Sequence, residues 1–224
     1  MYPFIKRFFD VLAALALLLL LLPLLLPVAV ILRLTAEGAV FYFQQRIGFH
    51  NKPFNIWKFA TMLRNSPNMG SGTITLRRDP RVTGPGRFLR KTKINELPQI
   101  VNVLIGDMSF VGPRPLDERG FQAYSNDVRT VIYNTRPGIT GIGSIVFRDE
   151  ERLLSQPGVD PKAFYASHIA PYKGALELWY LQNQSFATDL KLLLLTAWVV
   201  VFPNPKLVYR IFKNLPEKQE ALMI

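Results

Sequence analysis

A long uninterrupted run of apolar side chains lies near the N-terminus of the chain. Residues 11–32 read VLAALALLLLLLPLLLPVAVIL and contain no charged or polar side chain. A helix of this length would extend ~33 Å, about the thickness of a bilayer core. Pro23 and Pro27 lie inside the run, and each proline removes a backbone donor and bends or breaks a helix. The pattern therefore predicts a membrane segment.

Two paths through the membrane fit this segment. Basic residues flank both of its ends, namely Lys6, Arg7 and Arg33. A simple transmembrane helix satisfies the length. A helix-break-helix that enters one leaflet and returns better satisfies the flanking charges, because Lys and Arg favour the cytoplasmic side. The residues alone leave both paths open.

The pattern changes after the membrane segment to short aromatic and β-branched runs. Residues 40–43 and 54–59 are two such runs, and they flank the polar sequence GFHNK. This arrangement predicts a β-hairpin. Residues 64–86 are rich in Gly, Pro, Ser and Asn, which predicts a loop.

Helical spacing of apolar residues is clearest in the next segment. The apolar positions follow the i, i+3, i+4, i+7, i+8 pattern of one helix face: Leu97, Ile100, Val101, Leu104 and Ile105. Pro98 would then sit in the first turn, where a missing N–H costs nothing. Asn95 is predicted as the N-cap and Glu96 as the first helical residue. Both would lie at the positive end of the helix dipole, where anions bind.

Three later motifs are candidates for anion or metal chemistry. GPRP, residues 112–115, fixes Arg114 between two prolines, so that its guanidinium loses little further entropy on binding. RPGITGIGS, residues 136–144, is a glycine-rich turn whose backbone could approach a phosphate. FRDEE, residues 147–151, offers carboxylates for a metal or for an ion pair. Each motif taken alone is more often a solvated turn or a helix start.

The C-terminal third contains a further apolar run, residues 192–202, interrupted only by Thr196. This run is too short to span a bilayer. It predicts either a core helix or a helix on the membrane surface, and KLVYRIFKNL after it has the basic, amphipathic pattern of an interfacial helix.

Composition narrows the chemistry. The 224 residues carry 27 Lys and Arg against 16 Asp and Glu, a net charge of +11, which implies an anionic partner such as phospholipid, nucleic acid or a phosphorylated substrate. No nucleic-acid motif accompanies the charge, so nucleic acid is not expected as a partner. Cysteine is absent, which excludes disulfides, thiolate metal sites and cysteine nucleophiles.

Taken in order, these segments resemble the bacterial sugar transferases of the monotopic phosphoglycosyl transferase type, which start the assembly of capsules, O-antigens and exopolysaccharides. The resemblance covers most of the chain through KRFFD, FYFQQRIGFHNKPFNIWKF, DPRVTGPGRFLRKTKINELPQIVNVLIGDMSFVGPRP, RPGITGIGS and SFATDLKLLLLT. It implies transfer of a sugar 1-phosphate from a UDP-sugar to undecaprenyl phosphate, with release of UMP and a requirement for Mg²⁺. It also implies the re-entrant path, with its break at Pro23.

The expected fold class is α+β and predominantly helical. Residues 1–35 are expected to form the re-entrant membrane helix. Residues 36–224 are expected to form a catalytic domain on the cytoplasmic face of the bacterial inner membrane, with a small β-hairpin and amphipathic helices that lie on the membrane lipids. The oligomeric state is open, and a homodimer is one option.

The resemblance also implies a set of site residues. Family members ordinarily carry Asp-Glu where this chain has Asn95 and Glu96; the Asp is the nucleophile and the Glu helps to hold the metal. The arginines expected at the phosphates or the nucleotide are Arg87, Arg114, Arg136 and Arg148, with Arg90 as a further candidate.

Asn95 raises a question about activity, because an amide cannot form an acyl phosphate. Three explanations are open. The chain is an inactive form in which Asn95 preserves the shape of the site, or it uses Glu96 as the nucleophile. In the third, the lipid phosphate attacks the sugar diphosphate directly. A non-catalytic membrane-surface binding or scaffold protein is the rival function. The sequence does not identify the sugar.

Overall fold

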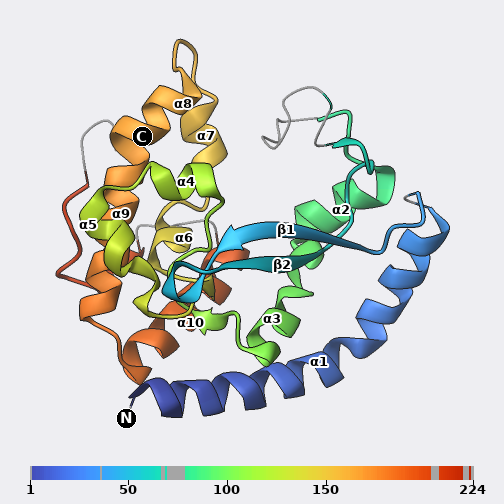
Figure 1. The fold of residues 1–224 in the computed structure, drawn as a ribbon, viewed down its shortest axis with the longest axis horizontal. Coiled ribbons are helices and arrows are strands. Elements are labelled where there is room, and N and C mark those ends of the chain that lie inside the picture. Colours follow the sequence, from blue (N-terminus) through green and yellow to red (C-terminus); the bar gives the residue numbers. More distant parts are fainter. Residues whose placement is uncertain are drawn as a thin grey trace. The chain divides into compact units, whose positions relative to one another are not determined.

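The computed structural model describes residues 2–35, 37–66, 69, 79–202, 207–218 and 222. The contacts divide the chain into two compact units. Their helices and strands are labelled in Figure 1. Unit 1 comprises residues 1–8, 46–54 and 107–224, and unit 2 comprises residues 9–45 and 55–106. The boundary predicted at residue 35 separates a membrane helix from a catalytic domain, whereas these units are defined by contacts within the protein. That boundary therefore stays a prediction.

The apolar N-terminal run forms one long helix, α1 (Tyr2–Leu34), with Pro23 and Pro27 both inside it. It is the one described helix that is long and apolar enough to cross a membrane. Only 6% of its most apolar window is buried within the protein, so these side chains need an apolar surrounding that the fold does not supply. The helix bears out the predicted membrane segment, and the re-entrant path stays a prediction.

The predicted β-hairpin is confirmed. Strands β1 (Phe41–Ile47) and β2 (Pro53–Phe59) form a two-stranded sheet, joined by the 3-10 turn η1 (Phe49–Asn51). His50 and Asn51 both have positive φ, which makes the tight reversal. In unit 2, Phe59 at the end of β2 packs with Leu32 of α1 and Leu89 in a small buried cluster.

The loop predicted for residues 64–86 is wrong at its C-terminal end. Helix α2 (Gly84–Thr92) begins at Gly84, where the Thr83 hydroxyl caps it by accepting a 3.1 Å hydrogen bond from the Gly86 N–H. The Thr-Gly-Pro sequence that suggested a loop is a helix start, because proline is favoured in the first helical turn. Most of the remaining loop, residues 67–68 and 70–78, lies outside the described residues.

The helix predicted from Glu96 onward begins later. A 3-10 turn, η3 (Ile94–Glu96), precedes α3 (Gln99–Ile105), whose N-cap is Pro98. Asn95 therefore lies inside the 3-10 turn, and its prediction as the α-helical N-cap is wrong. Lys93, with a left-handed φ of 62°, ends α2 and starts this turn, which leaves no room for an extended cap at residue 95.

Unit 1 is built around helix α9 (Ala170–Gln182). Two short parallel strands, β3 (Ser109–Val111) and β4 (Gly138–Thr140), pair with Ser109 opposite Gly138 and Val111 opposite Thr140. Short helices follow each strand: α4 (Glu118–Gln122), α5 (Asn126–Val131) and η4 (Ile132–Asn134) after β3, and α6 (Ile142–Val146), α7 (Glu150–Leu154), α8 (Pro161–Phe164) and the π-helical η5 (Tyr165–Ile169) after β4.

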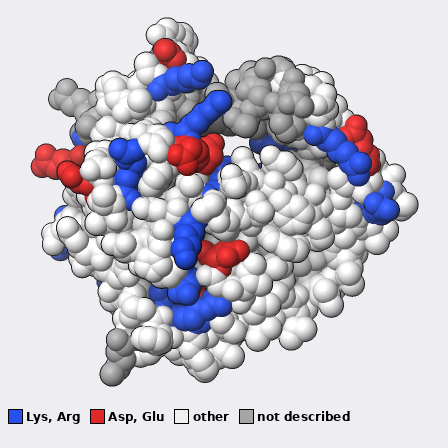
Figure 2. Space-filling view, viewed as in Figure 1, with Lys and Arg blue, Asp and Glu red and all other residues white. Residues whose placement is uncertain are grey.

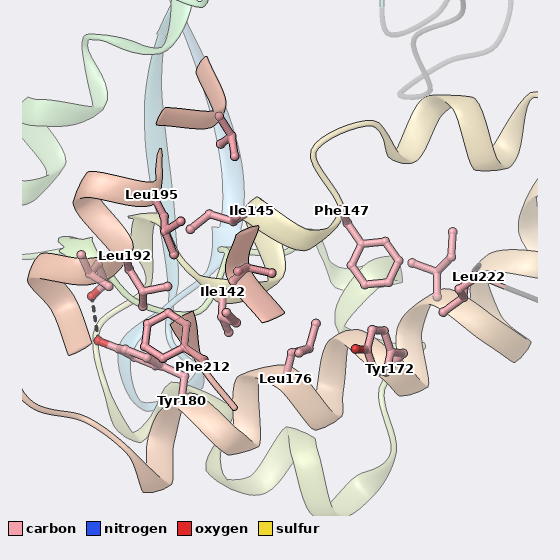
Figure 3. Packing of buried hydrophobic residues seen from close by; sticks show 14 residues of the cluster. Ile142, Ile145, Phe147, Tyr172, Leu176, Tyr180, Leu192, Leu195, Phe212 and Leu222 are labelled. Carbon is pink, nitrogen blue, oxygen red and sulfur yellow. Dashed lines mark hydrogen bonds between the residues drawn. The ribbon is translucent and has the colours of Figure 1, made fainter. Parts of the chain in front are cut away.

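The main core of unit 1 lies between α6, α9 and α10 (Phe186–Val201), with α11 (Leu207–Ile211) beside it. Figure 3 shows Ile142 and Ile145 of α6 between Leu192 and Leu195 of α10 and Leu176 of α9, with Tyr172 farther along α9 beside Phe147. A second cluster joins Phe121, Tyr124, Val128 and Tyr133 to Ala170 at the start of α9. The central helix is therefore covered on more than one side.

Helix α10 contains most of the apolar run 192–202, for which the sequence predicts either a core helix or a membrane-surface helix. Leu192, Leu195 and Val199 are almost completely buried, as expected of a core helix. Leu194 and Trp198, on the other face, are 63% and 47% exposed, as expected of a membrane-surface helix. The inner face confirms the predicted core helix, and the membrane-surface role of the outer face stays a prediction. The fold is mostly helical with a small antiparallel hairpin, as predicted.

Candidate functional site

Asn95 occupies a buried position with an unsatisfied oxygen. Its side chain is 7% exposed, and Asn95 Oδ1 has no hydrogen-bond partner among the described residues. The surrounding η3 turn is closed by two backbone bonds, from the Glu96 N–H to the Lys93 carbonyl at 3.0 Å and from the Leu97 N–H to the Ile94 carbonyl at 3.1 Å. Because a buried unpaired carbonyl oxygen is unfavourable, this atom is a candidate ligand for a cation or a donor.

The turn that carries Asn95 is fixed by α2. Leu89 of α2 is buried against Phe59, and Ile94 of η3 packs on the same cluster. The N-terminus of α2 in turn approaches Thr61 so closely that a Cβ on Gly86 would lie 2.2 Å from the Thr61 carbonyl oxygen. Glycine is therefore required at position 86. Arg87, one residue later, is exposed on this helix, and Arg90 is partly buried.

The helix that follows the turn is fixed by Asn102. This residue is fully buried, accepts a 2.9 Å hydrogen bond from the Trp57 N–H and donates a 2.8 Å hydrogen bond to the Asn55 carbonyl. Its amide thus pairs with the β2 backbone as a neighbouring strand would. The predicted apolar stripe is only partly buried: Ile105 is 60% exposed, whereas the polar Asn102 is inside. Sequence reasoning missed Asn102, although a lone amide beside Ile100 and Val103 was a visible signal.

Arg114 lies in unit 1, directly after β3. Its side chain is exposed, whereas Pro113 and Pro115 on either side are buried. The Pro113 carbonyl accepts a 2.8 Å hydrogen bond from the Gly138 N–H, which ties the GPRP segment to β4. The prediction that Arg114 is presented from a fixed backbone is supported by this geometry.

The glycines of residues 136–144 have a packing role. A Cβ on Gly138 would lie 2.1 Å from the Gly112 nitrogen, and one on Gly141 would lie 2.2 Å from the Gly112 oxygen. A Cβ on Gly112 would in turn meet the Arg136 carbonyl oxygen at 2.4 Å. These glycines let two backbone segments approach each other, which accounts for the glycine-rich motif without a bound phosphate.

The other arginines of unit 1 differ in their surroundings. The Arg136 guanidinium lies 4.8 Å from the centre of the Phe49 ring, a cation–π contact that leaves it partly buried. Arg148 is exposed and lies just after the C-cap of α6. The neighbouring Glu150 forms an ion pair with Lys173, which is one of the two roles offered for the FRDEE carboxylates. Among the described residues, no group of three or more His, Cys, Asp or Glu side chains could hold a metal.

The predicted site residues fall into two sets. Asn95, Glu96 and Arg87 belong to unit 2, and Arg114, Arg136 and Arg148 belong to unit 1. Their assignment to one catalytic site stays a prediction.

Much of the surface in Figure 2 carries neither acidic nor basic side chains, so the basic excess of the chain is not spread evenly over the face shown.

Two buried charged residues on α9 were not predicted. Lys173 is 6% exposed and Glu177 is 2% exposed. Burial lowers the pKa of the Lys173 ammonium, opposed chiefly by Glu150. Burial raises the pKa of Glu177 to about 8, partly offset by a hydrogen bond from the Arg114 backbone and by the charges of Lys173 and Arg114. Nothing in the sequence pattern distinguishes these residues from an exposed i, i+4 pair.

Comparisons with known proteins place the chain in a family. Residues 1–203 match the family model described as bacterial sugar transferase. The undecaprenyl-phosphate galactose phosphotransferase of Salmonella typhimurium is 32% identical over 213 residues, which cover 88% of this chain and 40% of that protein. The exopolysaccharide production protein ExoY of Rhizobium meliloti is 36% identical over 200 residues, which cover 83% of this chain and 80% of that protein.

A third relative is similar over a shorter stretch. The UDP-N-acetylgalactosamine-undecaprenyl-phosphate N-acetylgalactosaminephosphotransferase of Aeromonas hydrophila is 41% identical over 147 residues, which cover 65% of this chain. The chain spans only 34% of that protein and 40% of the Salmonella protein. The match over residues 1–203 includes the apolar helix, the hairpin and both sets of candidate residues, and the chain belongs to the bacterial sugar transferase family.

Proposed function

We propose that this protein transfers a sugar 1-phosphate from a UDP-sugar to undecaprenyl phosphate, as the first membrane step of surface glycan assembly. In this reaction a bond forms between the sugar-bearing phosphorus and an oxygen of the lipid phosphate, and the bond from that phosphorus to the bridging oxygen breaks, releasing UMP. The names of the relatives in Salmonella and Aeromonas, both undecaprenyl-phosphate sugar phosphotransferases, support this proposal.

The single observation that carries the site is the buried Asn95 Oδ1, which has no hydrogen-bond partner among the described residues and precedes Glu96 in the chain. Phosphoryl transfer needs groups that neutralise charge on the phosphate oxygens, and Mg²⁺ is the ion expected here. Mg²⁺ usually takes one or two protein oxygens and completes its shell with substrate phosphates and water. Asn95 Oδ1 and the Glu96 carboxylate fit this requirement and would hold the ion. When bound, the ion would neutralise the diphosphate oxygens.

The chain's own residues would bind and orient the diphosphate. The exposed Arg114 guanidinium, on a backbone held by two buried prolines, would donate two parallel hydrogen bonds to phosphate oxygens. Arg87 near the start of α2 would supply a further positive charge. Arg136 and Arg148 are the remaining candidates for the nucleotide.

The membrane provides the second substrate. The exposed apolar side chains of α1 and of the outer face of α10 would place the protein at a lipid surface, where undecaprenyl phosphate resides. We propose the cytoplasmic face of the bacterial inner membrane, because the basic residues at both ends of α1 favour one side. A cysteine at Tyr2 should resist a membrane-impermeant reagent added outside intact cells. Strong labelling would establish a span in place of the re-entrant path.

Asn95 supports a second candidate function. An amide is a poor nucleophile at phosphorus, so the chain would bind UDP-sugar or the lipid phosphate without turnover if a carboxylate at this position were required. The two functions differ in one measurement. UMP release is followed in nanodiscs that contain undecaprenyl phosphate and Mg²⁺, with UDP-glucose, UDP-galactose and their N-acetyl forms as donors.

The transferase proposal predicts UMP release with at least one donor and loss of release on Arg114→Ala. Arg119→Ala, at an exposed arginine of α4, is the matched control and should behave as the unaltered protein does. Binding of a donor without UMP release would favour the non-catalytic function. A protein that neither binds a donor nor releases UMP would overturn both proposed functions.

A further inference from the structure

Both backbone polar groups of Arg114 are bound by buried side chains of unit 1. The Glu177 carboxylate accepts a hydrogen bond from the Arg114 N–H. The Tyr133 hydroxyl donates a 2.8 Å hydrogen bond to the Arg114 carbonyl and accepts a 3.0 Å hydrogen bond from the Leu116 N–H. Glu177 is 2% exposed and Tyr133 is 1% exposed. The exposed arginine therefore stands on a backbone held from inside the protein.

The arrangement is unfavourable for stability, which points to another role. Glu177 Oε2 has no hydrogen-bond partner among the described residues, and burial of a carboxylate with incomplete hydrogen bonding is costly. The space around the carboxylate is also restricted, because a Cβ on Gly143 would lie 2.5 Å from Glu177 Oε1. An apolar residue at position 177 would avoid the cost of burying this polar group but would leave the Arg114 N–H without a buried acceptor.

The charged residue one turn earlier is also held in place. Lys173 pairs with Glu150 and lies over the rings of Phe147 and Tyr165, at 5.3 and 5.5 Å from their centres. Its positive charge favours the ionised form of Glu177. Helix α9 thus brings a fixed cation beside the carboxylate that binds Arg114.

We propose that Glu177 and Tyr133 are positioning residues that hold the Arg114 backbone so that its guanidinium meets the sugar diphosphate in one orientation. This inference rests on the proposed function, in which Arg114 binds the diphosphate. The two residues touch neither substrate, and they act through the Arg114 backbone. A bidentate contact depends on the direction of the guanidinium, so a loosened backbone would weaken it without removing the charge.

The first measurement reports the backbone itself. In the segment GPRP only Gly112 and Arg114 carry an N–H, so hydrogen exchange of ¹⁵N-labelled Arg114 can be followed by NMR or in a peptide that spans the segment. Exchange should accelerate in Tyr133→Phe and Glu177→Leu, and less in Glu177→Gln, which keeps an acceptor. Tyr172→Phe is the matched control, because Tyr172 is equally buried and its hydroxyl donates a 2.9 Å hydrogen bond to the distant Pro216 carbonyl.

The second measurement reports the consequence for the reaction. Tyr133→Phe and Glu177→Leu should lower kcat/KM for UMP release about tenfold, which corresponds to ~1.4 kcal/mol of transition-state stabilisation. Glu177→Gln should retain more activity than Glu177→Leu, and Tyr172→Phe should match the unaltered protein. In an Arg114→Lys background, Tyr133→Phe and Glu177→Leu should have no further effect, because the bidentate contact is already lost. The affinity for UDP with Mg²⁺ is measured on the same variants.

The outcomes separate the two proposals. If Arg114→Lys alone leaves turnover and UDP affinity unchanged, Arg114 does not bind the diphosphate, and both its role and the positioning role are overturned. If Arg114→Lys impairs turnover while Tyr133→Phe and Glu177→Leu behave like Tyr172→Phe, the positioning role alone is overturned. Losses of the same size with and without Arg114 would show a general structural effect, which also overturns it.

Discussion

Lys6 and Asp189 form an ion pair although they are 183 residues apart in the chain. The pair lies in unit 1 and joins the start of α1 to the first turn of α10. Both carboxylate oxygens of Asp189 are engaged, since Tyr2 donates to one at 2.7 Å and Tyr180 to the other at 2.8 Å. The N-terminus of the apolar helix is thereby attached to the core helix of unit 1.

Asp189→Asn should destabilise unit 1, because it leaves the largely but not fully buried Lys6 ammonium without its counter-charge. Breaking one partner of a buried pair costs about 3–5 kcal/mol. Thermal unfolding in nanodiscs should show a clear fall in Tm. Asp127→Asn, at an exposed position on α5, is the control and should leave Tm almost unchanged. Equal Tm values for the two variants would mean that the pair does not hold the helix.

Asn102→Leu should loosen the support of the η3 turn. The substitution keeps the size of the side chain but leaves the Trp57 N–H and the Asn55 carbonyl without their partner. An unsatisfied buried group costs about 1–3 kcal/mol, so denaturant unfolding should show a loss of at least that size. Ile105→Ala, on the exposed face of the same helix, should change stability by much less. A loss no greater than that of Ile105→Ala would contradict the assigned role of Asn102.

Asn95→Asp should show whether a cation binds at the side chain of residue 95. The variant places a carboxylate of nearly the same shape at a buried site where Oδ1 has no described partner, so it should need a cation to be stable there. Mg²⁺ should therefore raise the Tm of Asn95→Asp more than that of the unaltered protein. A larger shift in the unaltered protein would count against a cation at this atom.

The same variant should also release UMP before any lipid acceptor is added and retain the phosphosugar, which intact-mass measurement would detect. The unaltered protein should form no such adduct at Asn95. An adduct on the unaltered protein would direct attention to Glu96, which peptide mapping would test. Full activity of the unaltered protein without an adduct, lost on Asn95→Asp, would favour direct attack by the lipid phosphate.

Glu177 should make stability depend on pH. Its pKa in the folded protein is raised to about 8 by burial, whereas an exposed glutamate titrates near ~4.3. Between these values the folded state binds more protons than the unfolded state, so the free energy of unfolding should fall as pH rises, by at most about 1.4 kcal/mol per pH unit. Glu177→Gln should lack this decline between pH 5 and 8. Parallel stability curves for the two proteins would show that Glu177 titrates normally.

The outer face of α10 should contact lipid. In a variant that retains only Trp198, lipids with brominated acyl chains should quench the tryptophan fluorescence strongly, because Trp198 is 47% exposed on this face. A variant that retains only Trp179 is the matched control, since its ring packs on Phe212 at 5.1 Å and should be quenched weakly. Equal quenching would place both rings at the same distance from the acyl chains.

The sequence predicts best those elements whose apolar pattern is local. The hairpin follows from two short aromatic and β-branched runs around GFHNK, and the helix α10 follows from a longer apolar run; both are present. The predicted start of α3 is wrong because Asn95 and Pro98 are each typical of a helix start. The turn that begins at Lys93 places Asn95 inside η3 and leaves Pro98 as the N-cap. The partners of the buried polar residues could not be foreseen, although the apolar neighbours of Asn102 gave a signal of its burial. Asn102 and Glu177 are inside because of partners on β2 and in the Arg114 segment, and such partners are visible only in the folded chain.

The two-faced character of α10 has a consequence for how the purified protein would behave. Its inner face is part of the core of unit 1, so the helix cannot turn to hide the outer face without unfolding. In water without lipid or detergent, the exposed side chains of α10 can be covered only by other molecules of the same chain. Particle size in such a preparation would then report solubility rather than native assembly, so the open question of a homodimer has to be tested in a bilayer.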